Sequence, residues 1–210
     1  MKTYIHIKRI LDFVFSVLML IVLSPFMMII AAAIKLTSKG PVFFKQNRLG
    51  KDGRIFIIYK FRTMVDGAAS LGGGVFTNDK DFRITKTGHL LRKTSLDEVP
   101  QLFNIIMGDM SFIGPRPPVP YHPYTYENYT EEQKKRFTIR PGISGLAQVV
   151  YRTNATWNER ILKDIEYIDN ISFILDTNLF FKTIFNILKG KNVIQQEDTA
   201  KKIQDEILKR

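Results

Sequence analysis

The chain contains no cysteine among its 210 residues. It therefore has no disulfide framework, no cysteine-ligated zinc site and no cysteine nucleophile. This absence is compatible with a reducing, cytosolic environment. No internal repeat is found. The length is sufficient for one domain with a hydrophobic core and is short for two full domains.

Acidic residues are also scarce, because 20 Asp and Glu face 31 Lys and Arg and leave a formal charge of +11. Such an excess indicates an anionic partner: nucleic acid, anionic lipid or a phosphorylated substrate. The basic residues are scattered and form no stripe with interleaved aromatics, which argues against nucleic acid. A hydrophobic content of 45% is not that of a disordered chain.

One long apolar run extends from Ile10 to Ile34. Its length is sufficient for a membrane-spanning helix, which needs about 20 apolar residues. No small-residue cleavage site follows it, so it does not resemble a secretory signal. Pro25 lacks an N–H and favours a kink, and the adjacent Ser24 can satisfy backbone groups that the kink frees.

Basic residues flank this run on both sides: Lys2, Lys8 and Arg9 before it, Lys35 and Lys39 after it. Basic flanks prefer the cytosol. Both flanks stay there if the helix enters the membrane, bends at Ser24-Pro25 and returns. From these features alone a re-entrant hairpin and a straight span both remain open.

The rest of the chain predicts an α+β, helix-dominated fold. Residues 41–62 predict a β-hairpin with arms at 42–44 and 55–59 around a Gly-rich turn. Residues 66–88 and 140–148 are predicted as loops, and the Pro-rich segment 111–123 as extended chain without regular ladders. Helices are predicted at 89–92, 97–107, 130–137, 157–169 and 173–188, the last being amphipathic and suited to a membrane interface.

The strongest local motif is Asp97-Glu98, in the segment Ser95–Pro100. One interpretation is helix capping, either by a Ser95–Glu98 capping box or with Asp97 as the N-cap, which would place Pro100 where no donor is required. The other interpretation is catalysis. A carboxylate can attack phosphorus to form an acyl-phosphate. Spacing alone leaves the two open.

A catalytic carboxylate that meets a diphosphate needs cations to offset repulsion. Mg²⁺ binds one or two carboxylates together with phosphate oxygens. Arginine matches phosphate oxygens with its planar fork. The candidates are Arg62, Arg92, Arg116, Arg140 and Arg152.

Several longer strings occur in one order: 60–64 (KFRTM), 91–104 (LRKTSLDEVPQLFN), 108–117 (GDMSFIGPRP) and 140–149 (RPGISGLAQV), after the apolar segment with Ser24-Pro25. In this respect nearly the whole chain resembles the monotopic phosphoglycosyl transferases, or bacterial sugar transferases, in their small single-domain form.

The resemblance implies that Asp97 is the nucleophile on the β-phosphorus of a UDP-sugar and a Mg²⁺ ligand, and that UMP is released. Glu98 would assist proton handling when polyprenol (undecaprenyl) phosphate attacks the covalent intermediate. The arginines that match basic positions of the family, Arg92, Arg116, Arg140 and Arg152, would bind phosphate or nucleotide. Implied partners are the UDP-sugar, the polyprenol phosphate and membrane lipids, with downstream glycosyltransferases and a second copy of the chain as further candidates.

The resemblance also implies an architecture. Residues 1–39 would form a re-entrant helix–break–helix, 40–194 a compact cytosolic catalytic domain with interfacial amphipathic helices, and 195–210 a charged tail. Both termini would face the cytosol at the bacterial inner membrane. The alternatives are an inverting glycosyltransferase with a lipid acceptor, a non-enzymatic membrane-anchored basic protein that binds nucleic acid or anionic lipid, and a structural subunit of a polysaccharide export complex.

Overall fold

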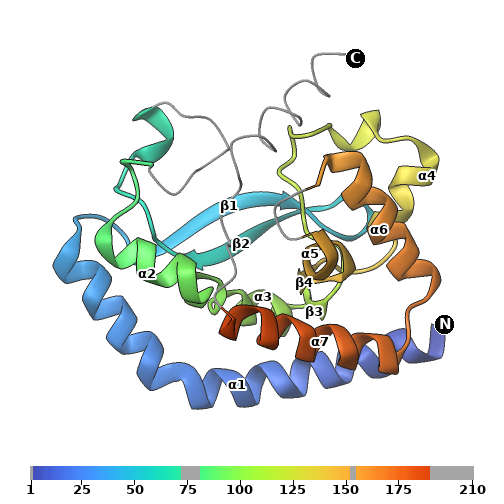
Figure 1. Cartoon of the computed structure of the whole chain (residues 1–210), viewed down its shortest axis with the longest axis horizontal. Coiled ribbons are helices and arrows are strands. Elements are labelled where there is room, and N and C mark those ends of the chain that lie inside the picture. Colours follow the sequence, from blue (N-terminus) through green and yellow to red (C-terminus); the bar gives the residue numbers. More distant parts are fainter. Residues whose placement is uncertain (1, 72–80, 152–154, 190–210) are drawn as a thin grey trace.

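The structure, a computed structural model, describes residues 2–71, 81–151 and 155–189. The predicted tail at 195–210 and Arg152 lie outside these residues. The described part is helix-dominated with small sheets, as predicted (Figure 1). Its α-helices and strands are α1 Lys2–Thr37, β1 Phe43–Leu49, β2 Ile55–Phe61, α2 Lys86–Thr94, α3 Gln101–Met107, β3 Ser111–Ile113, α4 Glu131–Lys134, β4 Gly142–Ser144, α5 Leu146–Tyr151, α6 Trp157–Asp169 and α7 Phe173–Leu188.

Helix α1 continues through Pro25 without interruption, and its ribbon bends midway so that the other elements lie on the concave side (Figure 1). Pro25 cannot donate to the carbonyl four residues earlier, that of Ile21. The Ser24 hydroxyl donates to this carbonyl at 2.9 Å, which confirms the predicted compensation. The predicted break at Ser24-Pro25 is therefore wrong, since the helix bends without ending there, and the re-entrant topology stays a prediction.

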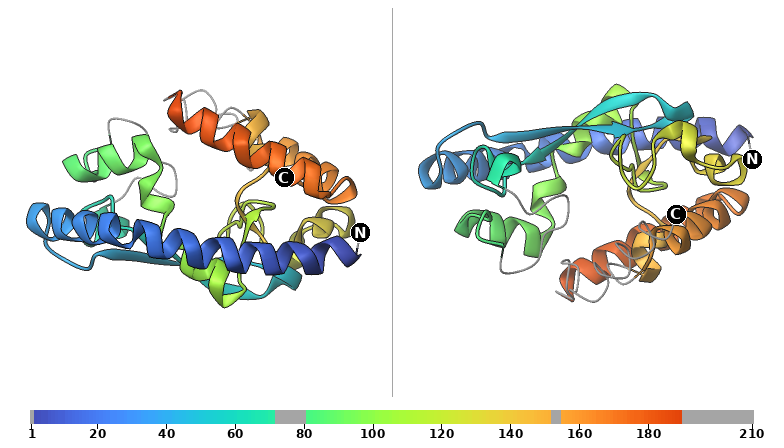
Figure 2. Two further views of the ribbon diagram at one scale, coloured as in Figure 1. Left: turned by 90° about the horizontal axis from the view of Figure 1, so that it is seen from below. Right: turned by 90° about the horizontal axis from the view of Figure 1, so that it is seen from above.

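A buried polar cluster attaches the N-terminal turns of α1 to α7. Nζ of Lys8 lies 2.7 Å from Oδ2 of Asp176. The hydroxyls of Tyr4 and Tyr167 donate to the two oxygens of Asp176, each at 2.6 Å. Buried charges are tolerated when they are paired and hydrogen-bonded in this way. Helix α7 consequently begins beside the start of α1, and the two helices diverge toward residue 188 (Figure 2).

Apolar side chains remain exposed along both of these helices. On α1 they include Val22 and Met28, each 67% exposed, and on α7 Ile174 and Leu188, 79% and 80% exposed. Helix α1 is long and apolar enough to cross a membrane by length and composition. An apolar face of this extent is typical of a protein that contacts a membrane or another protein.

The predicted β-hairpin is confirmed, with longer strands than expected. Strand β1 pairs antiparallel with β2, from Phe43 opposite Phe61 to Leu49 opposite Ile55. The turn uses left-handed backbone at Asp52 (φ 56°) and Gly53 (φ 72°), as the Gly-rich turn predicts.

Other loop predictions were wrong. Segment 140–148 contains strand β4 and the start of α5, and β4 pairs in parallel with β3. A ladder at 111–113 was not expected in the Pro-rich segment, but it ends before the first proline, Pro115, so no ladder donor is lost. Helix α2 begins at Lys86, inside the loop predicted for 66–88.

Candidate active site

Asp97 and Glu98 lie in a short 3-10 helix, Leu96–Glu98, between α2 and α3. Ser95 ends α2 in the left-handed conformation (φ 57°) and makes no side-chain capping bond. The N-cap of α3 is Pro100. Both capping interpretations are therefore wrong, and this leaves the two carboxylates without a capping role.

Two cations meet the Glu98 carboxylate from different segments. Nζ of Lys60, on β2, lies 2.5 Å from Oε1 of Glu98, and Nη2 of Arg116 lies 3.3 Å from the same oxygen. Lys60 also lies 3.9 Å from Oδ2 of Asp97. The side chains of Lys60, Asp97 and Glu98 are 14–20% exposed, so these charges interact with limited screening.

The two carboxylates have opposite pKa shifts. Burial raises the pKa of Asp97, and the charge of Glu98 raises it further, against the lowering effect of Lys60. Burial also acts to raise the pKa of Glu98, but Lys60 and Arg116 outweigh burial and bring it to about 2. Each of two neighbouring carboxylates disfavours the charged form of the other, and here Glu98 has the closer cations. Asp97 is thus the less neutralised carboxylate of the pair.

Sequence reasoning did not assign Lys60 to the site. Residues i and i+2 of a strand share a face, so Lys60 lies on the same side of β2 as Ile58. Ile58 is buried against Leu102 and Ile105 of α3. This face therefore directs Lys60 toward the turn that precedes α3. The signal in the sequence was the apolar Ile58 two positions before Lys60, since the two side chains share one face of the strand.

Packing places the carboxylates next to α1. Val99, which follows Glu98, contacts two core clusters that include Met27 and Ile34 of α1 and, partly buried, Leu20 and Leu23. The turn that carries the carboxylates is therefore joined to α1 through Val99.

The remaining predicted arginines occupy different places. Nε of Arg92 donates to Oγ1 of Thr63 at 2.9 Å, and the charge of Arg92 lowers the pKa of Asp97. Arg62 is buried and donates to the carbonyls of Ser38 and Lys39, so it binds the C-terminal end of α1 instead of facing the carboxylates.

Nε of Arg140 donates to the carbonyl of Gly108, at the C-terminal end of α3, at 2.6 Å. Arg152 lies outside the described residues. Of the five predicted arginines, Arg116 is thus in direct contact with the pair and Arg92 lies within electrostatic range.

Among the described residues no group of three or more His, Asp or Glu side chains could form an all-protein metal site. Mg²⁺ does not require one, because it commonly uses one or two carboxylates plus substrate phosphates. Asp97 supplies a hard oxygen donor, and the Lys60 ammonium lies 3.9 Å from its Oδ2 atom. The donor set fits a magnesium ion that binds together with a phosphorylated substrate.

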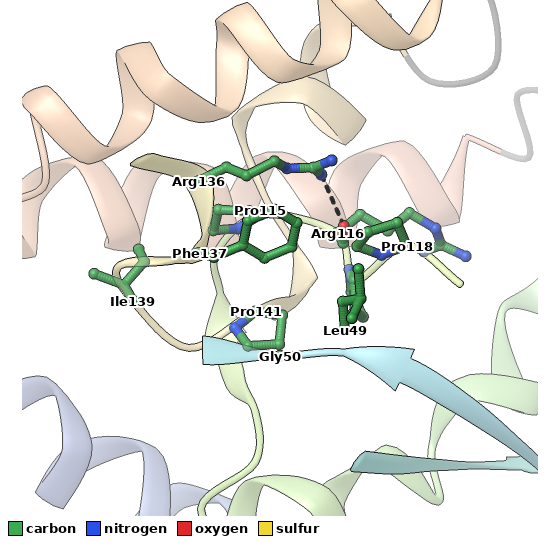
Figure 3. A pocket seen from close by; sticks show the side chains of 10 residues that line it. Leu49, Gly50, Pro115, Arg116, Pro118, Arg136, Phe137, Ile139 and Pro141 are labelled. Carbon is green, nitrogen blue, oxygen red and sulfur yellow. Dashed lines mark hydrogen bonds between the residues drawn. The ribbon is translucent and has the colours of Figure 1, made fainter. Parts of the chain in front are cut away.

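The loop that carries Arg116 lines a shallow hollow that is partly open to solvent and too narrow to hold a water molecule. Figure 3 shows Arg136 and Phe137 on one side of it and Leu49 and Pro118 on the other. No carboxylate is among the residues that line this hollow.

The fold and the site define a class of protein in which a long apolar helix supports two adjacent carboxylates surrounded by cations. The chain belongs to the bacterial sugar transferase family, whose model matches residues 3–190. This finding agrees with the resemblance seen in the sequence.

Curated relatives support the same family. The chain is 43% identical over 190 residues to the UDP-N-acetylgalactosamine-undecaprenyl-phosphate N-acetylgalactosaminephosphotransferase of Aeromonas hydrophila, covering 89% of this chain and 45% of that protein. It is 40% identical over 191 residues to the UDP-glucose:undecaprenyl-phosphate glucose-1-phosphate transferase of Klebsiella pneumoniae, covering 85% and 39%. It is 39% identical to the uncharacterized sugar transferase EpsL of Bacillus subtilis (strain 168), covering 90% and 91%. The chain thus spans less than half the length of the first two.

Proposed function

We propose that the chain transfers a sugar 1-phosphate from a UDP-sugar to undecaprenyl phosphate at the cytosolic face of the bacterial inner membrane. The observation that carries this proposal is the carboxylate pair Asp97-Glu98, held by Lys60 and Arg116 and followed by Val99, which packs against α1. Support also comes from relatives named as undecaprenyl-phosphate sugar phosphotransferases. A lipid-linked acceptor and a soluble donor can meet only at the membrane surface.

In the first step a carboxylate oxygen of Asp97 attacks the β-phosphorus of the donor. A bond forms between this oxygen and phosphorus, and the bond from phosphorus to the bridging oxygen breaks. UMP leaves with the bridging oxygen and its electron pair. Asp97 suits the nucleophile because Glu98 holds the nearest cations and leaves the Asp97 oxygens less neutralised.

In the second step an oxygen of the acceptor phosphate attacks the phosphorus of the aspartyl intermediate. The acyl-phosphate bond breaks, the Asp97 carboxylate is restored, and the lipid diphosphate sugar leaves. With a pKa of about 2, Glu98 is a weak base while Lys60 and Arg116 contact it. It gains proton-accepting strength only when these cations turn to the substrate phosphates, so their movement links substrate binding to proton handling.

A magnesium ion bound by Asp97 and the donor's phosphates would supply charge neutralisation of the diphosphate. The protein's own cations would serve the same purpose: Arg116, whose side chain is 42% exposed, is free to turn from Glu98 to a phosphate oxygen. Arg92 would contribute from the α2 side of the pair.

The membrane arrangement belongs to the same proposal. Helix α1 would enter the bilayer, bend near Pro25 and return, which keeps both termini in the cytosol. The exposed apolar residues of α7 would lie in the interface. Basic residues near an anionic surface add about 1 kcal/mol each. This arrangement would hold Asp97 at the depth of the acceptor phosphate.

Product analysis tests the proposal. Detergent-solubilised protein is incubated with undecaprenyl phosphate, Mg²⁺ and a panel of UDP-sugars, and nucleotide release is measured. We expect UMP from wild type, no UMP from Asp97→Asn, and severely slowed release from Glu98→Gln. Asp52→Asn is the matched control, because Asp52 is an exposed carboxylate of the hairpin turn. Release of UDP would identify the alternative inverting glycosyltransferase, and normal turnover by Asp97→Asn would overturn the nucleophile assignment.

A further inference from the structure

Arg116 lies on a loop, residues 114–118, whose backbone is held at both ends. Prolines occupy three of these five positions and fix φ on either side of Arg116. Backbone hydrogen bonds attach the loop to its surroundings: Gly114 N–H to Ser144 O at 2.8 Å, Gly142 N–H to Pro115 O at 2.9 Å and Leu49 N–H to Pro118 O at 2.9 Å.

The two carbonyls in the middle of the loop accept from arginine side chains. Nη2 of Arg136 donates to the carbonyl of Arg116 at 3.0 Å, drawn as the dashed line in Figure 3. Nη1 of Arg48, on β1, donates to the carbonyl of Pro117 at 3.0 Å. A guanidinium is planar and rigid, so each bond fixes direction as well as distance.

Both of these arginines are held in place themselves. Arg136 is 2% exposed, and its Nη2 also lies 2.6 Å from Oδ2 of the buried Asp164. Nη2 of Arg48 donates to Oε1 of Gln46 at 2.7 Å. Within the described residues Arg48 forms no ion pair, so its bond to the Pro117 carbonyl is not a by-product of a salt bridge.

We propose that Arg48 and Arg136 are positioning residues, which hold the loop so that Arg116 reaches Glu98 and the phosphates of the donor. The inference rests on the proposed function and explains how Arg116 is held in position. Burying a guanidinium costs free energy, whereas a neutral donor would be enough to satisfy a backbone carbonyl. Burial and the neighbouring Arg116 lower the pKa of Arg48 to about 10, which reports the same crowding of cations behind the site.

The long Arg116 side chain explains why such support is needed. It is 42% exposed and touches Glu98 at a single oxygen, 3.3 Å away. Its reach is therefore set by its backbone rather than by side-chain packing. A displacement of about 1 Å in a catalytic arrangement can reduce the rate about 100-fold.

Arg48→Met tests the proposal by removing the donor while retaining an apolar side chain. We expect UMP release to fall about 10- to 100-fold, and to fall no further when Arg48→Met is added to Arg116→Met, because Arg48 acts through Arg116. Arg54→Met is the matched control, since Arg54 is an exposed arginine beside the hairpin turn. Additive losses from Arg48→Met and Arg116→Met would overturn the proposal.

Arg136→Met alone would leave Asp164 buried without its partner. The double variant Arg136→Met/Asp164→Leu removes both charges together, so we expect it to fold. We expect it to reproduce the Arg48→Met loss of UMP release while its melting temperature stays near that of wild type. Wild-type turnover in this folded variant would overturn the role of Arg136.

Amide hydrogen exchange supplies a readout that does not depend on turnover. The Leu49 and Gly114 amides should exchange about tenfold faster in Arg48→Met than in Arg54→Met. The Leu49 N–H donates to the loop at Pro118, and the Gly114 N–H donates from the loop to Ser144. Unchanged exchange in Arg48→Met would overturn the positioning role. If exchange accelerates but wild-type protein releases no UMP, the proposed function fails while the role of Arg48 in holding the loop stands.

Discussion

Nζ of Lys60 lies 2.5 Å from Oε1 of Glu98, although 38 residues separate the two in sequence. The same nitrogen lies within 3.9 Å of Asp97, so one lysine on β2 serves both carboxylates. Burial raises the pKa of both carboxylates, and Lys60 opposes this effect at each of them, so its charge widens the pH range in which both are ionised.

Lys60→Met should therefore move the acid limb of the pH–rate profile to higher pH. The attacking form of Asp97 is the carboxylate, and burial already raises its pKa above the usual 3.8. Wild-type activity should fall as the pH decreases through this raised pKa. Removing the cation disfavours the carboxylate further, so the fall begins at higher pH.

The measurement is the initial rate of UMP release between pH 5 and pH 9. Lys51→Met is the matched control, because the ion pair of Lys51 with Asp52 is exposed to solvent. An acid limb that stays in place in Lys60→Met would show that Lys60 does not govern the ionisation of Asp97.

The position of Lys60 depends in turn on Asn104. This side chain is fully buried, accepts from the Tyr59 N–H at 3.0 Å and donates to the Ile57 carbonyl at 2.6 Å, and so joins α3 to β2. Asn104→Ala should lower the free energy of unfolding by about 1–3 kcal/mol, because the Tyr59 N–H and the Ile57 carbonyl both lose their partner.

Thermal unfolding in detergent checks this expectation. Asn47→Ala is the matched control, because Asn47 is an exposed asparagine on β1 and should change the melting temperature little. Equal melting temperatures for the two variants would contradict the structural role of Asn104.

Local sequence patterns predicted some elements fully. Helices α6 and α7 have the predicted bounds, 157–169 and 173–188, because their apolar period lies within each segment. Strand β4 was missed because a three-residue strand that pairs in parallel with distant β3 has no local period. Arg62 was misplaced for a related reason, since only the folded chain brings it to the end of α1.

The site was predictable in its chemistry but not in its contacts. The sequence indicated Asp97, Glu98 and Arg116 as residue types suited to phosphate chemistry, and the fold brings them together. The contact of Lys60 with the pair depends on how β2 packs on α3, which no single segment encodes.

The buried contact between Lys8 and Asp176 should be a main determinant of stability. Asp176→Leu removes the nearest partner of the buried Lys8, leaving only the longer contact with Asp12 at 3.9 Å, and removes the acceptor of the Tyr4 and Tyr167 hydroxyls. Breaking such a buried pair typically costs about 3–5 kcal/mol. We expect a lower melting temperature and faster proteolysis at the junction of α1 and α7.

Lys8→Met/Asp176→Leu should recover part of this loss, because the buried ammonium is removed together with its nearest carboxylate, while Asp12 keeps the hydrogen bond from the Ser111 hydroxyl. Glu166→Leu, which removes the exposed pair with Lys163, is the control and should have little effect. A melting temperature for Asp176→Leu equal to that of the control would refute the anchoring role.

The topology of α1 gives the last prediction. Because the chain has no native cysteine, His6→Cys and Lys39→Cys each introduce a unique thiol at an exposed residue on either side of the apolar segment. In the re-entrant arrangement a membrane-impermeant maleimide should label both thiols from the cytosolic face in inverted vesicles, and neither in spheroplasts. A straight span would expose one of them on each side.

Pro25→Ala should move part of the His6→Cys labelling to the external face, because the restored Ile21 hydrogen bond favours a straight helix. Pro41→Ala is the control, because Pro41 lies beyond the end of α1, and it should leave labelling unchanged. External labelling of His6→Cys in a protein that retains Pro25 would rule out the hairpin.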